Sequence, residues 1–303
     1  MARIALKIDV DTDRGTVEGV PRLVGLFERL NARATFLFSL GPDQTGRAIK
    51  RAFRRGFMGK VRRTSVLKHY GLKTLLYGTL LPGPHIGQRR GALMRGVGGA
   101  GFEVGVHTYN HVKWQDNVAA ADEPWTRQEL TLARDQFAQI FGRQPAVHGA
   151  AGWQVNRHVP RLEQELGFRY ASDSRGVGPF MPVADGAEIG VLQVPTTLPT
   201  LDELIGRPDL NGVDPIDHLL ALTGEYPDRD HVYTLHAELE GSTYLEAFER
   251  LLRSWRNRGV ELVDLARYVK TLSLAQLPRC EMVDGTVPGR SGLLACQGPG
   301  SAG

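Results

Sequence analysis

Two pairs of polar residues in this sequence have types and spacings that suit metal-assisted chemistry. Asp9 and Asp11 lie two residues apart at the end of the apolar stretch 4–12, and His107 and His111 lie four residues apart. On a strand, two residues at that spacing share a face, where paired carboxylates repel each other and favour a cation or a proton. A carboxylate with two histidines is a common ligand set for a divalent metal ion with open positions. The alternative for the two acids is a solvated strand end followed by a turn.

The surrounding sequence predicts the elements that would hold these pairs. Ile4, Leu6, Ile8 and Val10 alternate with other side chains, which is typical of a strand. Strands separated by helices favour a parallel sheet, and this many units predict a closed or nearly closed α/β barrel. We expect further strands near residues 34–38, 102–107, 145–148, 168–172, 189–194, 231–236 and 260–263, and helices near 19–31, 126–141, 159–166, 215–222 and 244–257.

Five polar residues fall at the C-terminal ends of these expected strands: Asp9, Asp11, His107, Asp173 and His236. Active sites of α/β barrels are built on that rim. Each residue taken alone is more often structural, and His236 alone would suit a satisfied core histidine. Five such residues at equivalent positions predict a shared site.

The length and composition of the chain limit its class. It has 303 residues, 42% of them hydrophobic, which suffices for one barrel-sized core or two smaller domains. No stretch approaches the roughly 18 apolar residues of a membrane-spanning helix. No signal peptide is expected, because a strand follows Arg3 at once. Cys280 and Cys296 form no metal-binding pattern, and we expect both to be reduced, as in a cytosolic protein.

The net charge of +4 hides a strongly basic segment. Residues 42–100 contain 13 Lys and Arg and one acid, Asp43, so this segment carries +12 and the remainder −8. Ile49, Phe53 and Phe57 lie on one helical face among the basic residues, which fits an anionic membrane surface. A solvated helical excursion packed on the barrel is the alternative. Nucleic acid is disfavoured as a partner, because no recognised nucleic-acid-binding fold accompanies the charge.

The ordered set of motifs resembles the polysaccharide deacetylases, the NodB-homology amidohydrolases. Asp-x-Asp in the first strand is followed by His-x-x-x-His, a later Asp and a late Leu-His. The resemblance implies a distorted (β/α) barrel, here of about seven strands with a basic insertion after the second. It is closest to one branch of the family, the 4-deoxy-4-formamido-L-arabinose-phosphoundecaprenol deformylases. The stretches that carry it are residues 8–12, 41–43, 149–153, 172–176, 195–200, 236–238 and 287–290.

The resemblance also implies a role for each residue of the set. Asp11, His107 and His111 would hold one divalent metal ion, either zinc, manganese or cobalt. Asp9 would act as the general base and His236 as the general acid. These types suit amide hydrolysis, which needs an activated water and a proton for the leaving nitrogen.

Four more residues are expected to support this site. Asp173 would orient His236 through a carboxylate–imidazole contact. Arg175, Trp153 and Glu238 would contact the substrate.

One loop departs from the wider family. Its members usually carry an Arg there that holds the catalytic Asp, whereas residues 148–153 of this chain contain none. Either Arg175 or another residue supplies that contact, or Asp9 is held differently. We assign His148 a structural role, because nothing in the sequence gives it a chemical one.

By resemblance, the expected protein is a peripheral hydrolase at the cytoplasmic face of the bacterial inner membrane. It would remove formyl from the undecaprenyl-phosphate-linked sugar, a step in lipid A modification with 4-amino-4-deoxy-L-arabinose and in resistance to polymyxin and other cationic peptides. Its partners would be that lipid-linked sugar and an anionic membrane surface. The alternatives are a general deacetylase of N-acetyl-sugar polysaccharides and a non-catalytic lipid-binding module. We expect a barrel at residues 1–270, including the basic insertion at 42–100, and a C-terminal tail at 271–303.

Overall fold

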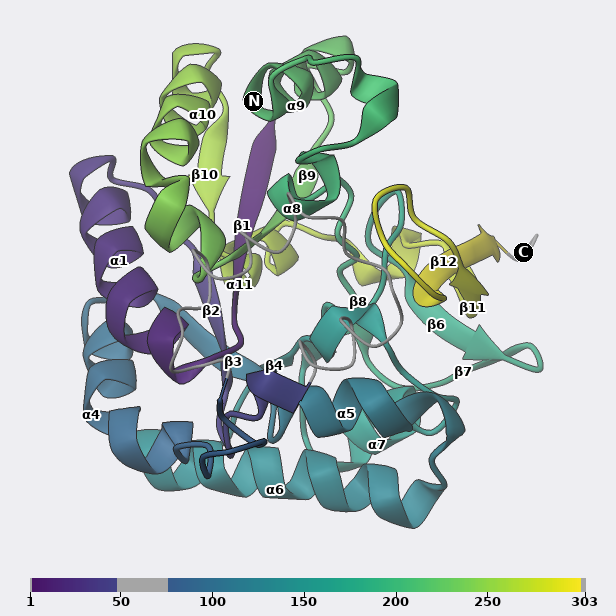
Figure 1. Ribbon diagram of the computed structural model, residues 1–303. Helices are drawn as coiled ribbons and strands as arrows, with labels where there is room; N and C mark the ends of the chain where they lie inside the picture. Colours follow the sequence, from purple (N-terminus) through teal and green to yellow (C-terminus); the bar gives the residue numbers. More distant parts are fainter. Residues whose placement is uncertain (1, 48–75, 301–303) are drawn as a thin grey trace.

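The computed structural model describes residues 2–47 and 76–300 (Figure 1), so much of the expected basic insertion lies outside the described residues. Its centre is a curled sheet of parallel strands in the order β10-β1-β2-β3-β4-β5-β8, with β9 paired to β1. The predicted α/β fold of the barrel type is therefore confirmed. The strands are β1 (Arg3–Val10), β2 (Thr35–Ser39), β3 (Glu103–Thr108), β4 (Val147–His148), β5 (Tyr170–Ala171), β8 (Leu192–Gln193), β9 (His231–His236) and β10 (Glu261–Val263).

Strand β1 lies in the middle of the sheet, and its side chains point alternately to the outer and the inner face. Ile4, Leu6, Ile8 and Val10 are buried in the apolar cluster that β1 shares with the outer helices. The intervening side chains point to the opposite face, where Ala5 joins a second apolar cluster inside the curl of the sheet. The polar residues of β1 lie on this inner face.

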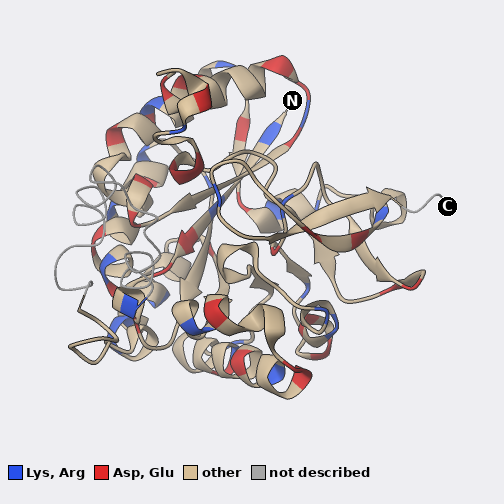
Figure 2. Cartoon of the chain, turned by 45° about the vertical axis from the view of Figure 1, so that its right-hand side comes forward, with Lys and Arg blue, Asp and Glu red and all other residues tan. Residues whose placement is uncertain are grey.

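Helices cover the outer face of the sheet (Figure 1). Each pairs an apolar side with a solvated one; α10, for example, buries Phe248, Leu251, Leu252 and Trp255. Figure 2 shows the charged residues spread over these outer helices and loops. The helices are α1 (Val20–Arg29), α4 (Ile86–Gly99), α5 (His111–Asn117), α6 (Glu123–Phe141), α7 (Val159–Glu165), α8 (Leu201–Leu204), α9 (Pro215–Glu225), α10 (Leu245–Asn257) and α11 (Leu265–Val269), with short helical turns at η1 (Gly15–Gly19), η2 (Val118–Ala120), η3 (Ala151–Trp153), η4 (Pro208–Leu210), η5 (Leu239–Thr243) and η6 (Leu274–Gln276).

A second, smaller sheet joins the C-terminal segment to the middle of the chain. Its strands are ordered β12-β11-β6-β7, with β11 at Arg279–Gly285, β12 at Leu294–Gly300, β6 at Met181–Ala184 and β7 at Ala187–Glu188. Arg175, which follows β5, donates its N–H to the Ala295 carbonyl oxygen at 2.8 Å. The C-terminal segment thus packs beside the ends of the barrel strands. The expected domain division at residue 270 stays a prediction.

Backbone hydrogen bonds continue the curl of the main sheet beyond β8. The amides of Thr197 and Leu198 donate to the Val232 carbonyl oxygen in β9, at 3.1 and 3.3 Å.

Cys280 and Cys296 are free thiols. Within residues 2–47 and 76–300, no helix combines the length and the apolar character needed to cross a membrane.

Candidate active site

Three predicted ligands converge at the C-terminal rim of the main sheet. Asp11 follows β1, His107 lies in β3, and His111 begins α5. The Nε2 atoms of His107 and His111 lie 3.3 and 3.4 Å from Asp11 Oδ1. One ligand atom from each residue lies within 4.8 Å of the others, so the three could share one ion.

Local contacts orient the His107 ring and place His111 at the start of α5. His107 Nδ1 lies 2.6 Å from the Gly149 carbonyl oxygen, which can only accept a hydrogen bond. His107 therefore carries a hydrogen on Nδ1 and directs Nε2 toward Asp11, the arrangement that metal-binding histidines adopt. Asn110 caps α5 by accepting a hydrogen bond from the Lys113 amide at 3.0 Å, which places His111 in the first turn.

The chemistry of this group fits a divalent cation. Asp11 Oδ1 is buried and has no hydrogen-bond donor among the described residues. Burial alone would raise the pKa of Asp11, but His111 and His107 outweigh it and hold that pKa far below its usual range. Burial lowers the pKa of His111, which favours the neutral imidazole that a metal requires. A carboxylate and two imidazoles match the ligand sets of zinc, manganese and cobalt.

The two residues expected to move protons flank this group from adjacent strands. Asp9 and His236 are direct register partners on the parallel strands β1 and β9. Asp9 is 3% exposed, and its Oδ1 lies 3.7 Å from His107 Nδ1. The backbone amide of His236 donates to Glu240 Oε2 at 3.0 Å. A carboxylate and an imidazole thus stand side by side next to the candidate metal group.

Comparison with known proteins gives two relatives that align with nearly the whole chain. A Shewanella sediminis (strain HAW-EB3) protein named "Probable 4-deoxy-4-formamido-L-arabinose-phosphoundecaprenol deformylase ArnD" is 33% identical over 298 residues, covering 98% of this chain and 95% of its own length. A Wigglesworthia glossinidia brevipalpis protein of the same name is 30% identical over 284 residues, covering 93% and 98%. A crystal structure described as a polysaccharide deacetylase from Mycobacterium smegmatis shares the fold, with a TM-score of 0.64 at 18% identity and coverage of 94% and 95%.

The sequence profile of the family described as polysaccharide deacetylase decides the assignment. It matches residues 8–171, more than half of the chain, and this range contains Asp9, Asp11, His107 and His111. The chain belongs to the polysaccharide deacetylase family. It is accordingly a hydrolase of amide bonds.

In this polysaccharide deacetylase Asp173 contacts a different histidine from the one expected. Asp173 Oδ1 lies 3.2 Å from His148 Nδ1, which is also 2.6 Å from Glu163 Oε1 in α7. All three side chains are completely buried. The carboxylate that faces His236 belongs instead to Asp202 in α8, whose Oδ1 lies 3.7 Å from His236 Nδ1. Asp202 was not predicted from the sequence, where its one signal is its place just after the 195–200 stretch.

Glu238 holds the backbone of the deacetylase site. Its Oε1 accepts hydrogen bonds from the Asp11 amide at 3.1 Å, the Thr12 amide at 2.8 Å and the Thr12 hydroxyl at 2.7 Å. These bonds fix the turn that carries Asp11. Burial is the main influence that raises the pKa of Glu238 to about 8, and the nearby Asp11 carboxylate is the second. Its predicted contact with substrate remains a prediction.

Trp153 and Arg175, the other residues predicted to bind substrate, are packed within the protein. Trp153 is 1% exposed, and the guanidinium groups of Arg175 and Arg290 lie 4.8 and 4.9 Å from the centroid of its ring. Arg175 pairs with Glu203 at 2.5 Å. Arg290 comes from the C-terminal segment and contacts Asp202 at 3.0 Å and Glu203 at 2.9 Å. The C-terminal segment therefore reaches the carboxylate that faces His236.

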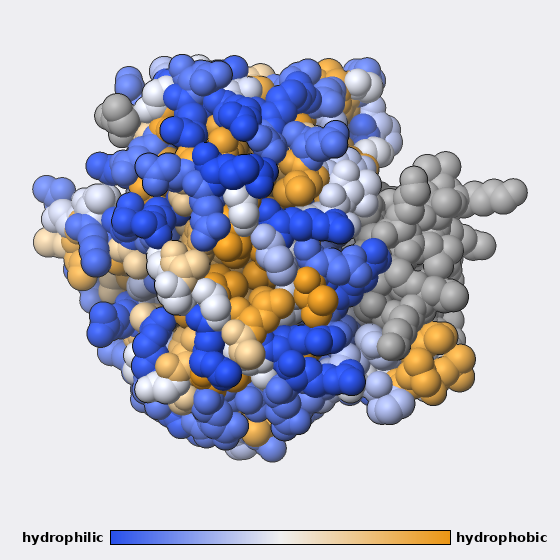
Figure 3. All heavy atoms as spheres, turned by 90° about the vertical axis from the view of Figure 1, so that its left-hand side faces the viewer, coloured by the Kyte–Doolittle hydropathy of each residue, from blue (hydrophilic) through white to orange (hydrophobic). Residues whose placement is uncertain are grey.

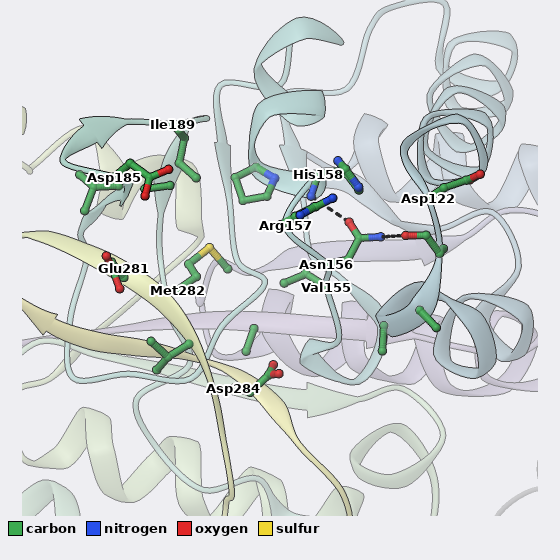
Figure 4. Close-up of a pocket in the computed structure, with 18 residues that line it drawn as sticks. Asp122, Val155, Asn156, Arg157, His158, Asp185, Ile189, Glu281, Met282 and Asp284 are labelled. Carbon is green, nitrogen blue, oxygen red and sulfur yellow. Dashed lines mark hydrogen bonds between the residues drawn. The ribbon is translucent and has the colours of Figure 1, made fainter.

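A separate cavity of about 790 Å³ lies between the loop that contains Asn156 and the second sheet (Figure 4). Asp185, Glu281 and Asp284 line it on one side, and Arg157 and His158 on the other. Among the described residues that line it, none belongs to the candidate metal group or its two flanking residues. It is distinct from the candidate active site of this deacetylase.

Proposed function

We propose that this chain hydrolyses the formamide of 4-deoxy-4-formamido-L-arabinose phosphoundecaprenol and releases formate and the lipid-linked amino sugar. The observation that carries this proposal is the grouping of Asp11, His107 and His111 beside Asp9 and His236. The choice of substrate is supported by the two relatives named for this deformylation, which match 98% and 93% of the chain. The step would serve lipid A modification and resistance to polymyxin.

The proposed cofactor is one divalent metal ion held by Asp11, His107 and His111. When bound, such an ion would polarise the formyl oxygen and lower the pKa of a water molecule in the site. Zinc, manganese and cobalt all accept imidazole and carboxylate ligands. The orientation of His107 by Gly149 and of the Asp11 turn by Glu238 would preform this group.

The chain's own residues would carry the protons. Asp9 would accept a proton from the water that attacks the formyl carbon. His236, as imidazolium, would donate a proton to the sugar nitrogen as the carbon–nitrogen bond breaks. The products are formate and the free amine. Asp202 would keep His236 oriented and cationic.

A direct competition between substrates tests the proposal. The purified protein, supplied in turn with zinc, manganese and cobalt, is incubated with the formamido-arabinose lipid and with an acetylated chitin oligomer. We expect formate release from the lipid and little acetate release from the oligomer. Acetate release without formate release would favour a general polysaccharide deacetylase instead.

We also propose that the protein works at the cytoplasmic face of the inner membrane, where its lipid-linked substrate would be held. Leu80 is 80% exposed and Leu81 40% exposed, and both belong to the basic segment at residues 42–100. Figure 3 shows apolar side chains exposed on this face of the molecule. Exposed leucines in a basic segment suit an anionic membrane surface, with apolar side chains in the acyl region and cations at the headgroups.

A further inference from the structure

Lys7 is a buried cation on the inner face of β1, next to Asp9. Its side chain is 0% exposed, and its Nζ lies 3.5 Å from Asp9 Oδ2. The same Nζ donates a hydrogen bond to the Ser172 carbonyl oxygen at 2.9 Å and lies 5.3 Å from the centroid of the Trp153 ring. A carboxylate, a carbonyl oxygen and an aromatic face are all favourable neighbours for an ammonium group.

The fold leaves room for this ammonium at Gly149. A Cβ atom at that position would lie 3.2 Å from Lys7 Cε and 3.3 Å from Lys7 Nζ, and 2.4 Å from Leu37 Cδ1. The carbonyl oxygen of Gly149 is the acceptor that orients His107. One glycine therefore admits Lys7 on one side and fixes a candidate metal ligand on the other.

The two carboxylate oxygens of Asp9 have different surroundings. Oδ2 faces the Lys7 ammonium, whereas Oδ1 is buried and has no hydrogen-bond donor among the described residues. His107 Nδ1 lies 3.7 Å from Oδ1, but its hydrogen is directed to the Gly149 carbonyl oxygen. A carboxylate that accepts a proton needs one oxygen with a free lone pair in a fixed orientation, and Oδ1 has that property.

Asp9 is also the one carboxylate within 4.0 Å of Lys7 in the described part of the chain. Arg175 is engaged elsewhere, with Glu203 at 2.5 Å and the Leu198 carbonyl oxygen at 3.0 Å. Buried ion pairs are often no more stabilising than apolar residues of the same volume. Stability alone therefore does not explain a lysine at this position.

We propose that Lys7 is the positioning residue of Asp9: it holds Oδ2 and leaves Oδ1 free to accept the proton of the attacking water. This inference rests on the proposed function for the base role of Asp9, whereas the Lys7–Asp9 contact itself can be tested without substrate.

The main experiment is a double-mutant cycle with Lys7→Met and Asp9→Asn in the metal-loaded full-length protein. Lys7→Met keeps the length of the side chain and removes its charge; Lys270→Met makes the same change at an exposed lysine and is the control. We expect Lys7→Met to lower kcat for deformylation about 10–100-fold, the range typical of residues that orient active-site groups. KM and metal stoichiometry should stay unchanged, and Lys7→Arg should recover part of the activity.

The cycle separates positioning from a general structural role. In the Asp9→Asn background, Lys7→Met should cause no further loss, because the carboxylate that Lys7 holds is already gone. An equal loss in both backgrounds, or full kcat in folded Lys7→Met, would overturn the proposal.

A second measurement observes the ammonium group of Lys7 directly and needs neither substrate nor catalytic turnover. A fully buried ammonium exchanges its hydrogens slowly, so its ¹H–¹⁵N signal should be detectable by NMR and assignable by its loss in Lys7→Arg. Asp9→Asn should shift this signal, whereas Asp202→Asn should leave it in place. A signal unaffected by Asp9→Asn would show that Lys7 does not contact Asp9 and would overturn the proposal. Failure of the wild-type protein to release formate, with the shift present, would reject the proposed substrate instead.

Discussion

Asp202 Oδ1 lies 3.7 Å from His236 Nδ1, across the rim between α8 and the end of β9. Burial alone would lower the pKa of His236, but Asp202 and then Asp11 outweigh it and raise that pKa to about 9. Burial would raise the pKa of Asp202, but Arg290 and His236 keep it below its usual value. At neutral pH the pair is therefore an imidazolium beside a carboxylate, as a general acid requires.

Replacing Asp202 should move the alkaline limit of activity. The imidazolium of His236 is lost as the pH rises through its pKa, so activity should fall on the alkaline side. Asp202→Asn removes the negative charge that contributes most to raising the pKa of His236, so the alkaline loss of activity should occur at lower pH. The profile of kcat/KM against pH measures this shift. Asp209→Asn, an exposed acid paired with Arg207, is the control; an unmoved alkaline limit in Asp202→Asn would contradict the pairing.

Removing one imidazole of the candidate metal group should remove metal and activity together. His111→Ala leaves Asp11 and His107 as two ligands, too few for tight retention of one ion. Metal content after gel filtration and formate release should both fall to near background. His218→Ala, on α9, should retain both. Full metal occupancy in His111→Ala would reject this ligand set.

His148 should contribute to stability and not to chemistry. Its Nδ1 contacts both Glu163 Oε1 and Asp173 Oδ1, and these acids outweigh burial and raise its pKa to about 10. Burial and then Asp173 raise the pKa of Glu163 well above its usual value, whereas His148 and Glu163 keep Asp173 ionised. His148→Gln would leave the buried Asp173 carboxylate without its cation and should lower the free energy of unfolding by about 3–5 kcal/mol. Urea denaturation near pH 6 measures the loss.

The pH dependence of that loss has a defined sign. The folded-state pKa of His148, about 10, lies above its unfolded value of about 6.5. Its stabilising contribution is thus complete below about pH 6.5 and disappears as the pH rises through 10. The difference between wild type and His148→Gln should shrink over this interval. A difference that grows with pH would contradict a cationic His148.

Charge introduced at the exposed leucines should weaken membrane binding. Leu80→Asp with Leu81→Asp places two acids in the basic segment, which should reduce binding to vesicles that contain anionic lipid. Binding of the wild type should fall as salt rises, because exposed charges are screened within about 8 Å at physiological ionic strength. Sedimentation with vesicles measures both effects. Leu274→Asp, at a leucine that is 55% exposed elsewhere, is the control; equal binding by both variants would argue against this surface.

The local pattern of the sequence predicted the main elements and the candidate metal ligands. Residues two apart on an extended chain share a face, so the spacing of Asp9, near the end of β1, and Asp11, just after it, predicts that their carboxylates lie near one another. His107 at the end of β3 and His236 at the end of β9 followed from the rule that parallel strands end on one rim. These inferences depend only on backbone geometry over a few residues.

The pairing of charges on that rim was decided by the tertiary structure. Asp173 was expected beside His236, but it faces His148, while Asp202 and Arg290 occupy the neighbourhood of His236. Such contacts depend on the length and path of each loop after its strand. The periodicity of the sequence within single strands and helices does not determine these paths. Lys7 shows the same limit of local pattern. Its spacing from Asp9 places both side chains on one face of β1. Its position against Asp9 Oδ2, however, depends on the space beside Gly149 and on the hydrogen bond to the Ser172 carbonyl oxygen, which only the folded chain provides.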